Sequence, residues 1–291
     1  MSNSLVVNSS NVFGSYNNTY QYKFIQGSFQ SKDCEMAIGS ATIPYSWCNI
    51  SSLYGNNKMT INFPYLATTY TMDITFPDGF YTTTDISNYI QLQCLNNGLY
   101  LTFGGQNYFF ISLSTNTNYY TNQFVFSLVP ITVASGPYSG YSLPATGYWS
   151  ASFGLPTVTS TPYVTCPSTS SIGSVLGFSA GIYPTAPYTT NQTSQSDLTP
   201  VGSTINGVLI RCNLLDNNIT MPSDILDCIP INAQFGSNIT YDPSYAKWIK
   251  IKDGIYSSLT ITLTDQNFNT IYARDPNLII TLMIRQRSNM E

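Results

Sequence analysis

The sequence predicts an all-β fold of antiparallel strands with one short helix and a loop-rich insertion. The closing residues 257–285 contain two apolar runs with strand periodicity, separated by a turn. Strands and helices do not alternate along the chain, which excludes a parallel βαβ sheet. Residues 134–199 are rich in Gly, Pro, Ser, Thr and Tyr, a composition that permits only short strands between long turns.

The first quarter of the chain contains four predicted strands after a polar arm. Residues 1–18 are rich in Asn and Ser, and we expect a loose arm there. Apolar residues at every second position mark the strands that follow. They are predicted at Tyr20–Phe29, Cys34–Trp47, Lys58–Tyr65 and Thr69–Phe76.

One helix is predicted at residues 84–96. Thr82 and Asp85 have the spacing of a capping box, Ile86 and Ile90 lie one turn apart, and Gly98 follows the last turn. The helix carries no chemical motif, and we expect it to close one end of a sheet.

The rest of the chain supplies the strands that complete a jelly roll. They are expected at Tyr108–Ser114, Gln123–Val133, Gly207–Cys212, Ser257–Leu263 and Asn277–Ile284, with a short helical turn at Asp224–Ile231. About eight antiparallel strands joined by long crossings favour a single jelly-roll β-sandwich.

The last strand is apolar on nearly both faces, so we expect it to lie deep in a sheet. We predict that Asn277–Ile284 pairs with residues 34–46 and that Ser257–Leu263 pairs with residues 58–65. The predicted jelly-roll domain comprises residues 1–133 and 200–291, and residues 134–199 form an inserted outer domain.

Charge is scarce throughout the sequence. Only 8% of residues are charged, against roughly 25% in an average globular protein, and residues 86–196 contain no Asp, Glu, Lys or Arg. Removing water from a surface of neutral polar and aromatic groups costs little free energy. We therefore favour a surface that contacts other proteins, and the alternative is a sparingly soluble monomer. The net charge of -4 argues against a dedicated nucleic-acid binder.

The sequence assigns no catalytic, cofactor-binding or metal-binding residues, and it implies no cofactor. It contains no histidine, which removes the commonest general base and a common zinc ligand. The six cysteines show no metal-binding spacing, so buried free thiols are favoured over a disulfide framework. They are Cys34, Cys48, Cys94, Cys166, Cys212 and Cys228. We expect no secretory signal and no membrane span.

Three acidic or basic clusters were weighed as sites. Asp265 opens a stretch resembling a calcium loop, but Thr270 and Pro276 replace the required Gly and Glu, so a hairpin turn is favoured. Asp224 and Asp227 lie three residues apart and could share a helix face as an acid–base catalytic pair, but surface or capping roles are commoner. Asp216, Asp224 or Asp227 could also bind a metal between subunits, although no other residue supports such a site. A solvated face is favoured for the basic residues, which are Lys247, Lys250, Lys252, Arg285 and Arg287.

Aromatic residues in the middle of the chain have two open interpretations. They could stack against sugars or pack against a neighbouring subunit. They are Tyr119, Tyr120, Tyr138, Tyr141, Tyr148, Trp149 and Tyr183.

Three stretches resemble a known family. They are residues 74–82, residues 176–184, and residues 208–214 with their continuations at 222–226 and 282–285. Together they are similar to the minor capsid (penton) proteins of virophages and of the related Polinton/Maverick elements, over residues 40–286.

The resemblance implies a single jelly roll with an inserted outer domain. It also implies a homopentamer at each icosahedral five-fold vertex, beside a double-jelly-roll major capsid protein, in a virion assembled in the host cytoplasm. No sequence-specific nucleic-acid contact is expected. The alternatives are a lectin-like viral surface head that binds glycans or a receptor, and a hydrolase, for which the residues are missing.

Overall fold

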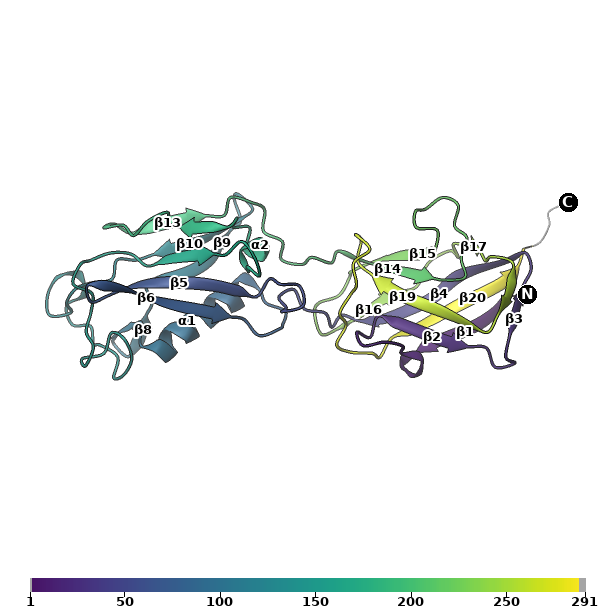
Figure 1. Ribbon diagram of the computed structural model, residues 1–291, viewed down its shortest axis with the longest axis horizontal. Coiled ribbons are helices and arrows are strands. Elements are labelled where there is room, and N and C mark those ends of the chain that lie inside the picture. Colours follow the sequence, from purple (N-terminus) through teal and green to yellow (C-terminus); the bar gives the residue numbers. More distant parts are fainter. Residues whose placement is uncertain (1, 288–291) are drawn as a thin grey trace. The chain divides into compact units, whose positions relative to one another are not determined.

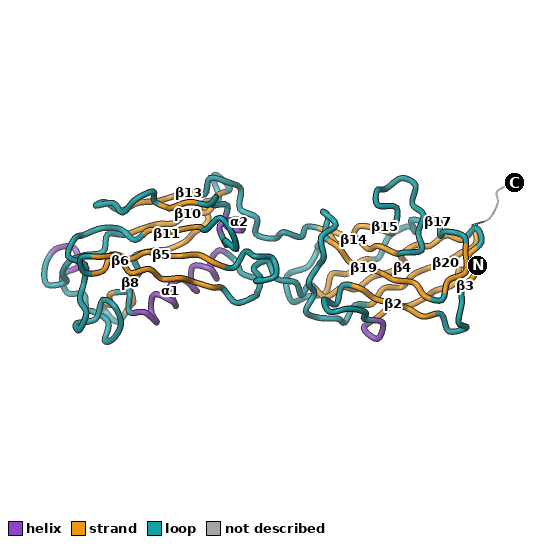
Figure 2. The backbone as a smooth tube through the Cα atoms, viewed as in Figure 1, coloured by secondary structure: helices purple, strands orange, loops and turns teal. Residues whose placement is uncertain are grey.

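The computed structural model describes residues 2–287 as strands and loops with little helix (Figures 1 and 2). The chain divides into two compact units. One comprises the residues up to Cys48 and from Ile205 onward; the other is Asn49–Thr204. We call them the jelly-roll unit and the insertion unit.

The jelly-roll unit contains two main sheets. The first has the order β1–β20–β4–β16, with β17 also paired to β4, and the second has the order β15–β14–β19–β2. The first comprises β1 (Ser2–Asn8), β20 (Ile279–Gln286), β4 (Cys34–Pro44), β16 (Asn238–Tyr241) and β17 (Ile249–Lys250). The second comprises β15 (Ile225–Pro230), β14 (Gly207–Cys212), β19 (Ser258–Thr264) and β2 (Thr19–Lys23). A small pair joins β3 (Phe29–Ser31) to β18 (Gly254–Tyr256), and η1 (Ser9–Asn11) follows β1.

The order of these strands is that of a jelly roll. The eight principal strands of this unit can be numbered along the chain. One sheet holds the first, eighth, third and sixth, and the other holds the second, seventh, fourth and fifth. This double Greek key confirms the predicted fold class. The insertion unit occupies the connection between the third strand, β4, and the fourth, β14.

Burial follows the two-residue period of the strands. Ile280, Leu282 and Ile284 of β20 are buried, as are Leu259, Ile261 and Leu263 of β19. Each sheet therefore turns one apolar face inward, and the two form a sandwich.

The insertion unit contains two further sheets and the predicted helix. Their orders are β12–β11–β5–β6 and β13–β10–β9. The strands are β5 (Lys58–Tyr65), β6 (Thr68–Thr75), β11 (Tyr163–Cys166), β12 (Gly181–Tyr183), β9 (Ile111–Asn116), β10 (Thr121–Phe126) and β13 (Gln192–Gln195). The remaining elements are α1 (Thr83–Asn97), the hairpin of β7 (Leu101–Phe103) and β8 (Gln106–Tyr108), η2 (Gly136–Tyr138) and α2 (Gly173–Leu176).

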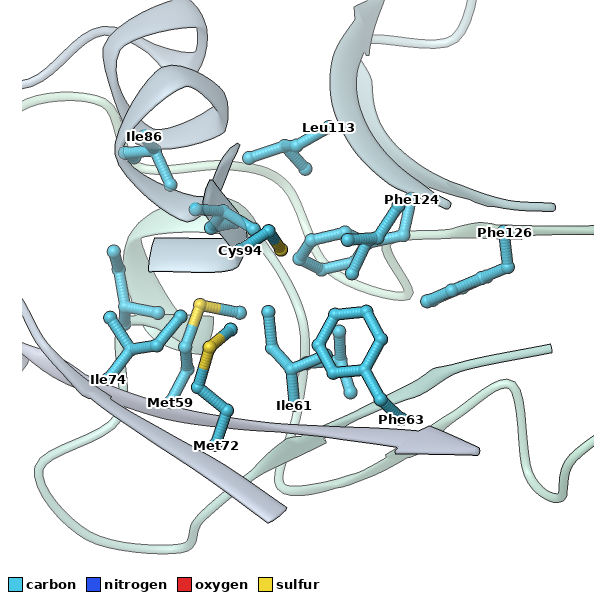
Figure 3. Packing of buried hydrophobic residues seen from close by; sticks show 14 of the residues in the cluster. Met59, Ile61, Phe63, Met72, Ile74, Ile86, Cys94, Leu113, Phe124 and Phe126 are labelled. Carbon is cyan, nitrogen blue, oxygen red and sulfur yellow. The ribbon is translucent and has the colours of Figure 1, made fainter. Parts of the chain in front are cut away.

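One continuous apolar core holds the insertion unit together. Met59, Ile61 and Phe63 of β5 face residues of β10 and α1, including Phe124 and Cys94 (Figure 3). Val164 and Cys166 of β11 belong to the same core. Strands before and after residue 134 therefore share one core.

This shared core shows that the predicted domain limits were wrong. Residues 49–133 were assigned to the jelly roll and only 134–199 to the insertion, whereas β5 pairs with β11 and the whole of Asn49–Thr204 forms one unit. The change of composition near residue 134 marks where loops become long. It does not mark where one core ends and another begins.

The last strand pairs as predicted and lies inside a sheet, between β1 and β4. The expectation that both of its faces are buried was wrong, and so was the predicted pairing of Ser257–Leu263. β20 pairs antiparallel with β4, as predicted. Its outer face is open, since Ile279 is 51% exposed. β19 pairs with β2 and β14 and not with residues 58–65, and it lies in a different sheet from β20.

Two further segments form strands where none was expected. The predicted loose arm contains β1, which pairs with β20, and the predicted helical turn at 224–231 is β15, which pairs with β14. Both are short segments whose conformation depends on a distant partner strand. The predicted helix is confirmed at Thr83–Asn97, with the capping box formed by Thr82 and Asp85.

Candidate assembly surface

The outer face of the first sheet of the jelly-roll unit carries charged side chains only at one end, and its other side chains are uncharged. The register places Val6 opposite Thr281 and Asn8 opposite Ile279, and these side chains point away from the core because their neighbours Val7, Ile280 and Leu282 are buried. We call this set the neutral face. It consists of Ser4, Val6, Asn8, Ser40, Thr42, Thr240, Ile279, Thr281 and Met283.

A bulge shapes the centre of the neutral face. Thr281 pairs with Ser40 and Leu282 with Ile38, so Gly39 of β4 has no partner residue. A Cβ atom at Gly39 would lie 3.3 Å from Cγ of Met283. Glycine at this position lets the Met283 side chain lie flat against β4.

Charge is confined to one end of this sheet. Arg285 donates to Glu35 Oε2 from Nε at 3.1 Å and from Nη2 at 2.9 Å, and its guanidinium lies 4.0 Å from the ring centre of Trp248. Arg287 Nε lies 3.8 Å from Glu35 Oε1. Two of the basic residues predicted to form a solvated face are therefore paired at the rim of the neutral face.

Both aspartates considered for catalysis are held in ion pairs. Asp224 accepts from Arg211 Nε and Nη2 at 2.8–3.1 Å. Asp227 accepts from Lys247 Nζ at 2.8 Å and from the Tyr241 hydroxyl at 2.6 Å, and this bond to Asp227 raises the pKa of Lys247. The two residues are not on one helix face, since they lie at β15. Within residues 2–287, no cluster of three or more His, Cys, Asp or Glu side chains could hold a metal ion.

The possible calcium loop is a turn held by its own aspartate. Asp265 Oδ1 accepts from the backbone N–H groups of Asn267 and Asn269, both at 2.8 Å, and Oδ2 accepts from Asn269 Nδ2 at 3.0 Å. A bridge between Thr264 and Thr270 closes the loop. The predicted turn is present, and the carboxylate oxygens already have partners.

Two of the aromatic residues that could have stacked on a sugar pack in or against the core of the insertion unit. Trp149 is fully buried and its Nε1 donates to Pro64 O at 3.1 Å. Tyr148 stacks on Tyr70 with ring centres 3.7 Å apart, and burial, together with the hydrogen bond to Tyr148, raises the pKa of Tyr70 to about 12. Trp149 is therefore not available for stacking on a ligand, and Tyr148 already stacks on a ring of the protein.

Among the other aromatic candidates, only Tyr119 and Tyr120 are largely exposed. Tyr138 and Tyr141 pack edge-to-face on each other and on Tyr108. The Tyr183 hydroxyl lies 2.9 Å from Ser179 Oγ. Tyr119 and Tyr120, at the turn between β9 and β10, are 71% and 73% exposed.

All six cysteines are free thiols. Burial raises the pKa of Cys94, Cys166 and Cys212 to about 12, so these thiols stay protonated and unreactive at neutral pH. Cys48 is also buried, Cys34 is partly buried, and Cys228 is exposed. The expectation of buried free thiols holds for four of the six.

Comparisons with known proteins gave matches among solved structures. No protein-family model and no curated protein matches the sequence. The chain is similar to the mavirus penton protein, with 9% identity, a TM-score of 0.41, and coverage of 98% of each chain. It is also similar to a chain of the cryo-EM structure of the Sputnik virophage, with 11% identity, a TM-score of 0.43, and coverage of 100% of this chain and 99% of that one. Between Ser2 and Arg287, no helix is both long and apolar enough to cross a membrane.

Proposed function

We propose that the protein is a structural capsid subunit, a penton protein that forms homopentamers at the five-fold vertices of an icosahedral virion. The observation that carries the proposal is the neutral face on a jelly-roll sandwich. In this role the subunit performs no catalysis. Its partners are further copies of itself and a double-jelly-roll major capsid protein, and it is assembled in the host cytoplasm.

The fold alone leaves several functions open. Jelly rolls occur in viral capsid proteins, in lectins and in cupins, and a fold does not determine function. The neutral face favours the capsid role, because uncharged side chains lose little on desolvation when another protein covers them. Three sequence stretches that resemble virophage penton proteins add independent support.

A ring of five copies needs one contact repeated around an axis. Such a contact is heterologous, so one surface of a subunit meets a different surface of the next, and the rotation closes the ring. The neutral face supplies one of the two surfaces. Exposed apolar residues elsewhere on the jelly-roll unit are candidates for the other; they include Ile25, Ile219, Met221 and Ile255.

The mass of the purified protein in solution tests the proposal. We expect pentamers, or larger assemblies when the major capsid protein is present, by analytical ultracentrifugation across a range of salt. Ile279→Asp places a charge on the neutral face, and we expect it to release monomers without unfolding, because the side chain is already half exposed.

Val158→Asp is the matched control, since Val158 is 67% exposed and lies in the insertion unit, outside both contact surfaces considered above. It should leave the assembly intact or weaken it less. A protein that stays monomeric at high concentration, with and without the major capsid protein, would contradict the proposal. Equal dissociation by both variants would remove the neutral face as the contact surface.

The second candidate function is a lectin-like head. Of the aromatic residues that could stack on a sugar, Trp149 is buried in the core and Tyr148 packs on Tyr70, which argues against a sugar site there. A separate cavity in the insertion unit offers a better location.

A further inference from the structure

A cavity of about 440 Å³ opens on the insertion unit beside the first turn of α1. Its volume falls within the range of roughly 300–1,000 Å³ typical of small-molecule sites. The walls come from the start of α1, the β9–β10 turn, α2 and residues 200–202. The lining residues that matter for the argument are Thr82, Thr83, Thr115, Tyr120, Thr121 and Asn122.

The cavity carries no formal charge. Its lining contains no Asp, Glu, Lys or Arg. The nearest acidic group within the helix cap, Asp85, already accepts from the hydroxyl and the backbone N–H of Thr82. An ionic ligand would lose its hydration here without gaining an ion pair, so the lining favours a neutral one.

Three of the threonine hydroxyls that line the cavity already donate their protons to other side chains. Thr83 Oγ1 and Thr115 Oγ1 both donate to Asn122 Oδ1, at 3.3 and 3.2 Å, and Thr82 Oγ1 donates to Asp85. The Asn122 amide is only 3% exposed and is fixed by donating from Nδ2 to Leu176 O at 3.1 Å. The oxygens of Thr83 and Thr115 therefore keep lone pairs but no free proton, and they can only accept.

The same wall also contains an unfilled hydrogen-bonding group. Thr121 Oγ1 is buried and has no partner among residues 2–287. A buried hydroxyl without a hydrogen-bond partner destabilises the folded state by roughly 1–3 kcal/mol.

An aromatic ring stands at this cavity in a strained backbone position. Tyr120 has a φ of 53° and is 73% exposed, so its ring contributes little to the core. Left-handed φ values cost an L-residue roughly 1–2 kcal/mol, and glycine would fit this turn with less strain. An exposed tyrosine at such a position is explained better by contact with a ligand than by stability.

We propose that this cavity binds a neutral saccharide. The apolar C–H face of a sugar ring would lie on Tyr120, and its hydroxyls would donate to the waiting oxygens of Thr83 and Thr115. A sugar meets both requirements, because it is uncharged and rich in hydroxyl donors. The proposal depends only on the insertion unit, so it stands or fails separately from pentamer formation.

A printed glycan array followed by calorimetry on the full-length chain tests the proposal. The array should include neutral, sialylated and sulfated glycans, and the calorimetric probes are methyl glycosides of the common neutral hexoses and N-acetylhexosamines. We expect binding to neutral glycans only. Tyr120→Ala should weaken it about tenfold, which corresponds to 1.4 kcal/mol, and Thr83→Val about fivefold.

Tyr119→Ala is the matched control, because Tyr119 is equally exposed in the same turn but does not line the cavity. It should change the affinity by less than about twofold. Unchanged circular dichroism would show that each variant is folded. The proposal is overturned if no neutral glycan binds, if only charged glycans or peptides bind, or if Tyr119→Ala and Tyr120→Ala have the same effect.

Discussion

Asp85 and Thr82 show how much of one helix two side chains can define. Thr82 N and Oγ1 donate to Asp85 Oδ2 at 2.9 and 2.6 Å, and Asp85 N donates back to Thr82 Oγ1 at 3.2 Å. These hydrogen bonds from Thr82 lower the pKa of Asp85, and the bond from the Thr82 hydroxyl has a larger effect than the bond from its backbone N–H. At the other end, Gly98 adopts a φ of 63°, where a Cβ atom would lie 2.2 Å from Thr146 O. Local residues therefore define both ends of α1, and at Gly98 the close approach of Thr146 also requires glycine.

Removing the cap should destabilise the insertion unit. We expect Thr82→Ala to lower the free energy of unfolding by about 1 kcal/mol at pH 7, because a backbone donor loses its partner. Denaturant unfolding followed by the helical circular dichroism signal measures it. Thr84→Ala is a control, since Thr84 is exposed and lies outside the capping box.

The same cap should make the free energy of unfolding depend on pH. The folded pKa of Asp85 is lowered, so its contribution is complete above the unfolded value near 4 and is lost as the pH falls through the folded pKa. The advantage of the wild type over Asp85→Ala should therefore be larger at pH 7 than at pH 2. An advantage that grows on acidification would show that the carboxylate is not the capping group.

β20 shows how one strand can carry two roles on its two faces. Ile280, Leu282 and Ile284 fill the sandwich, while Ile279, Thr281 and Met283 belong to the neutral face. A slip of one residue in register would exchange these sets. The bulge at Gly39 and the ion pair between Arg285 and Glu35 at the strand end hold the register in place.

Adjacent isoleucines of β20 should therefore respond differently to truncation. Ile280→Ala should lower the free energy of unfolding by about 2–5 kcal/mol, because it leaves a cavity in the core. Ile279→Ala should change it by less than about 0.5 kcal/mol, because its side chain is already half exposed. Chemical denaturation of the two variants measures the difference. Similar losses at both positions would contradict the observed register.

At the scale of the whole molecule, two cores lie in one chain. The jelly-roll unit is built from both ends of the sequence, and the insertion unit from an unbroken stretch with its own apolar core. A unit with a continuous chain and its own core has what it needs to fold alone.

The fragment 49–204 should fold without the jelly roll. Trp149 is its only tryptophan, because Trp47 and Trp248 lie in the other unit, so fluorescence reports on this core alone. We expect blue-shifted emission typical of a buried indole and a single cooperative unfolding transition. Emission typical of a solvent-exposed indole, with no transition, would show that the insertion unit needs the jelly roll.

Local signals were sufficient for the features whose causes are local. The helix at 83–97, the turn at Asp265 and the strand character of β4, β5, β6, β14, β19 and β20 follow from caps, turn residues and periodicity. The antiparallel all-β class follows from the same periodicity, and the low charge is read directly from the composition. Of the candidate sites, Tyr120 was among the aromatic residues considered, but the cavity it lines was not predictable, because its walls come from segments up to about 120 residues apart.

Antiparallel sheets, neutral surfaces and one capped helix could all be predicted from the residues, since these properties depend on close neighbours along the chain. The folded structure was needed to show that the insertion begins at residue 49, that β1 and β15 are strands, and that Trp149 is buried while Ile279 is exposed. The physical reason is that these features depend on which distant strand supplies the hydrogen bonds and which core takes up the side chain. Many pairings of similar apolar strands satisfy the local pattern equally well, and packing selects one of them.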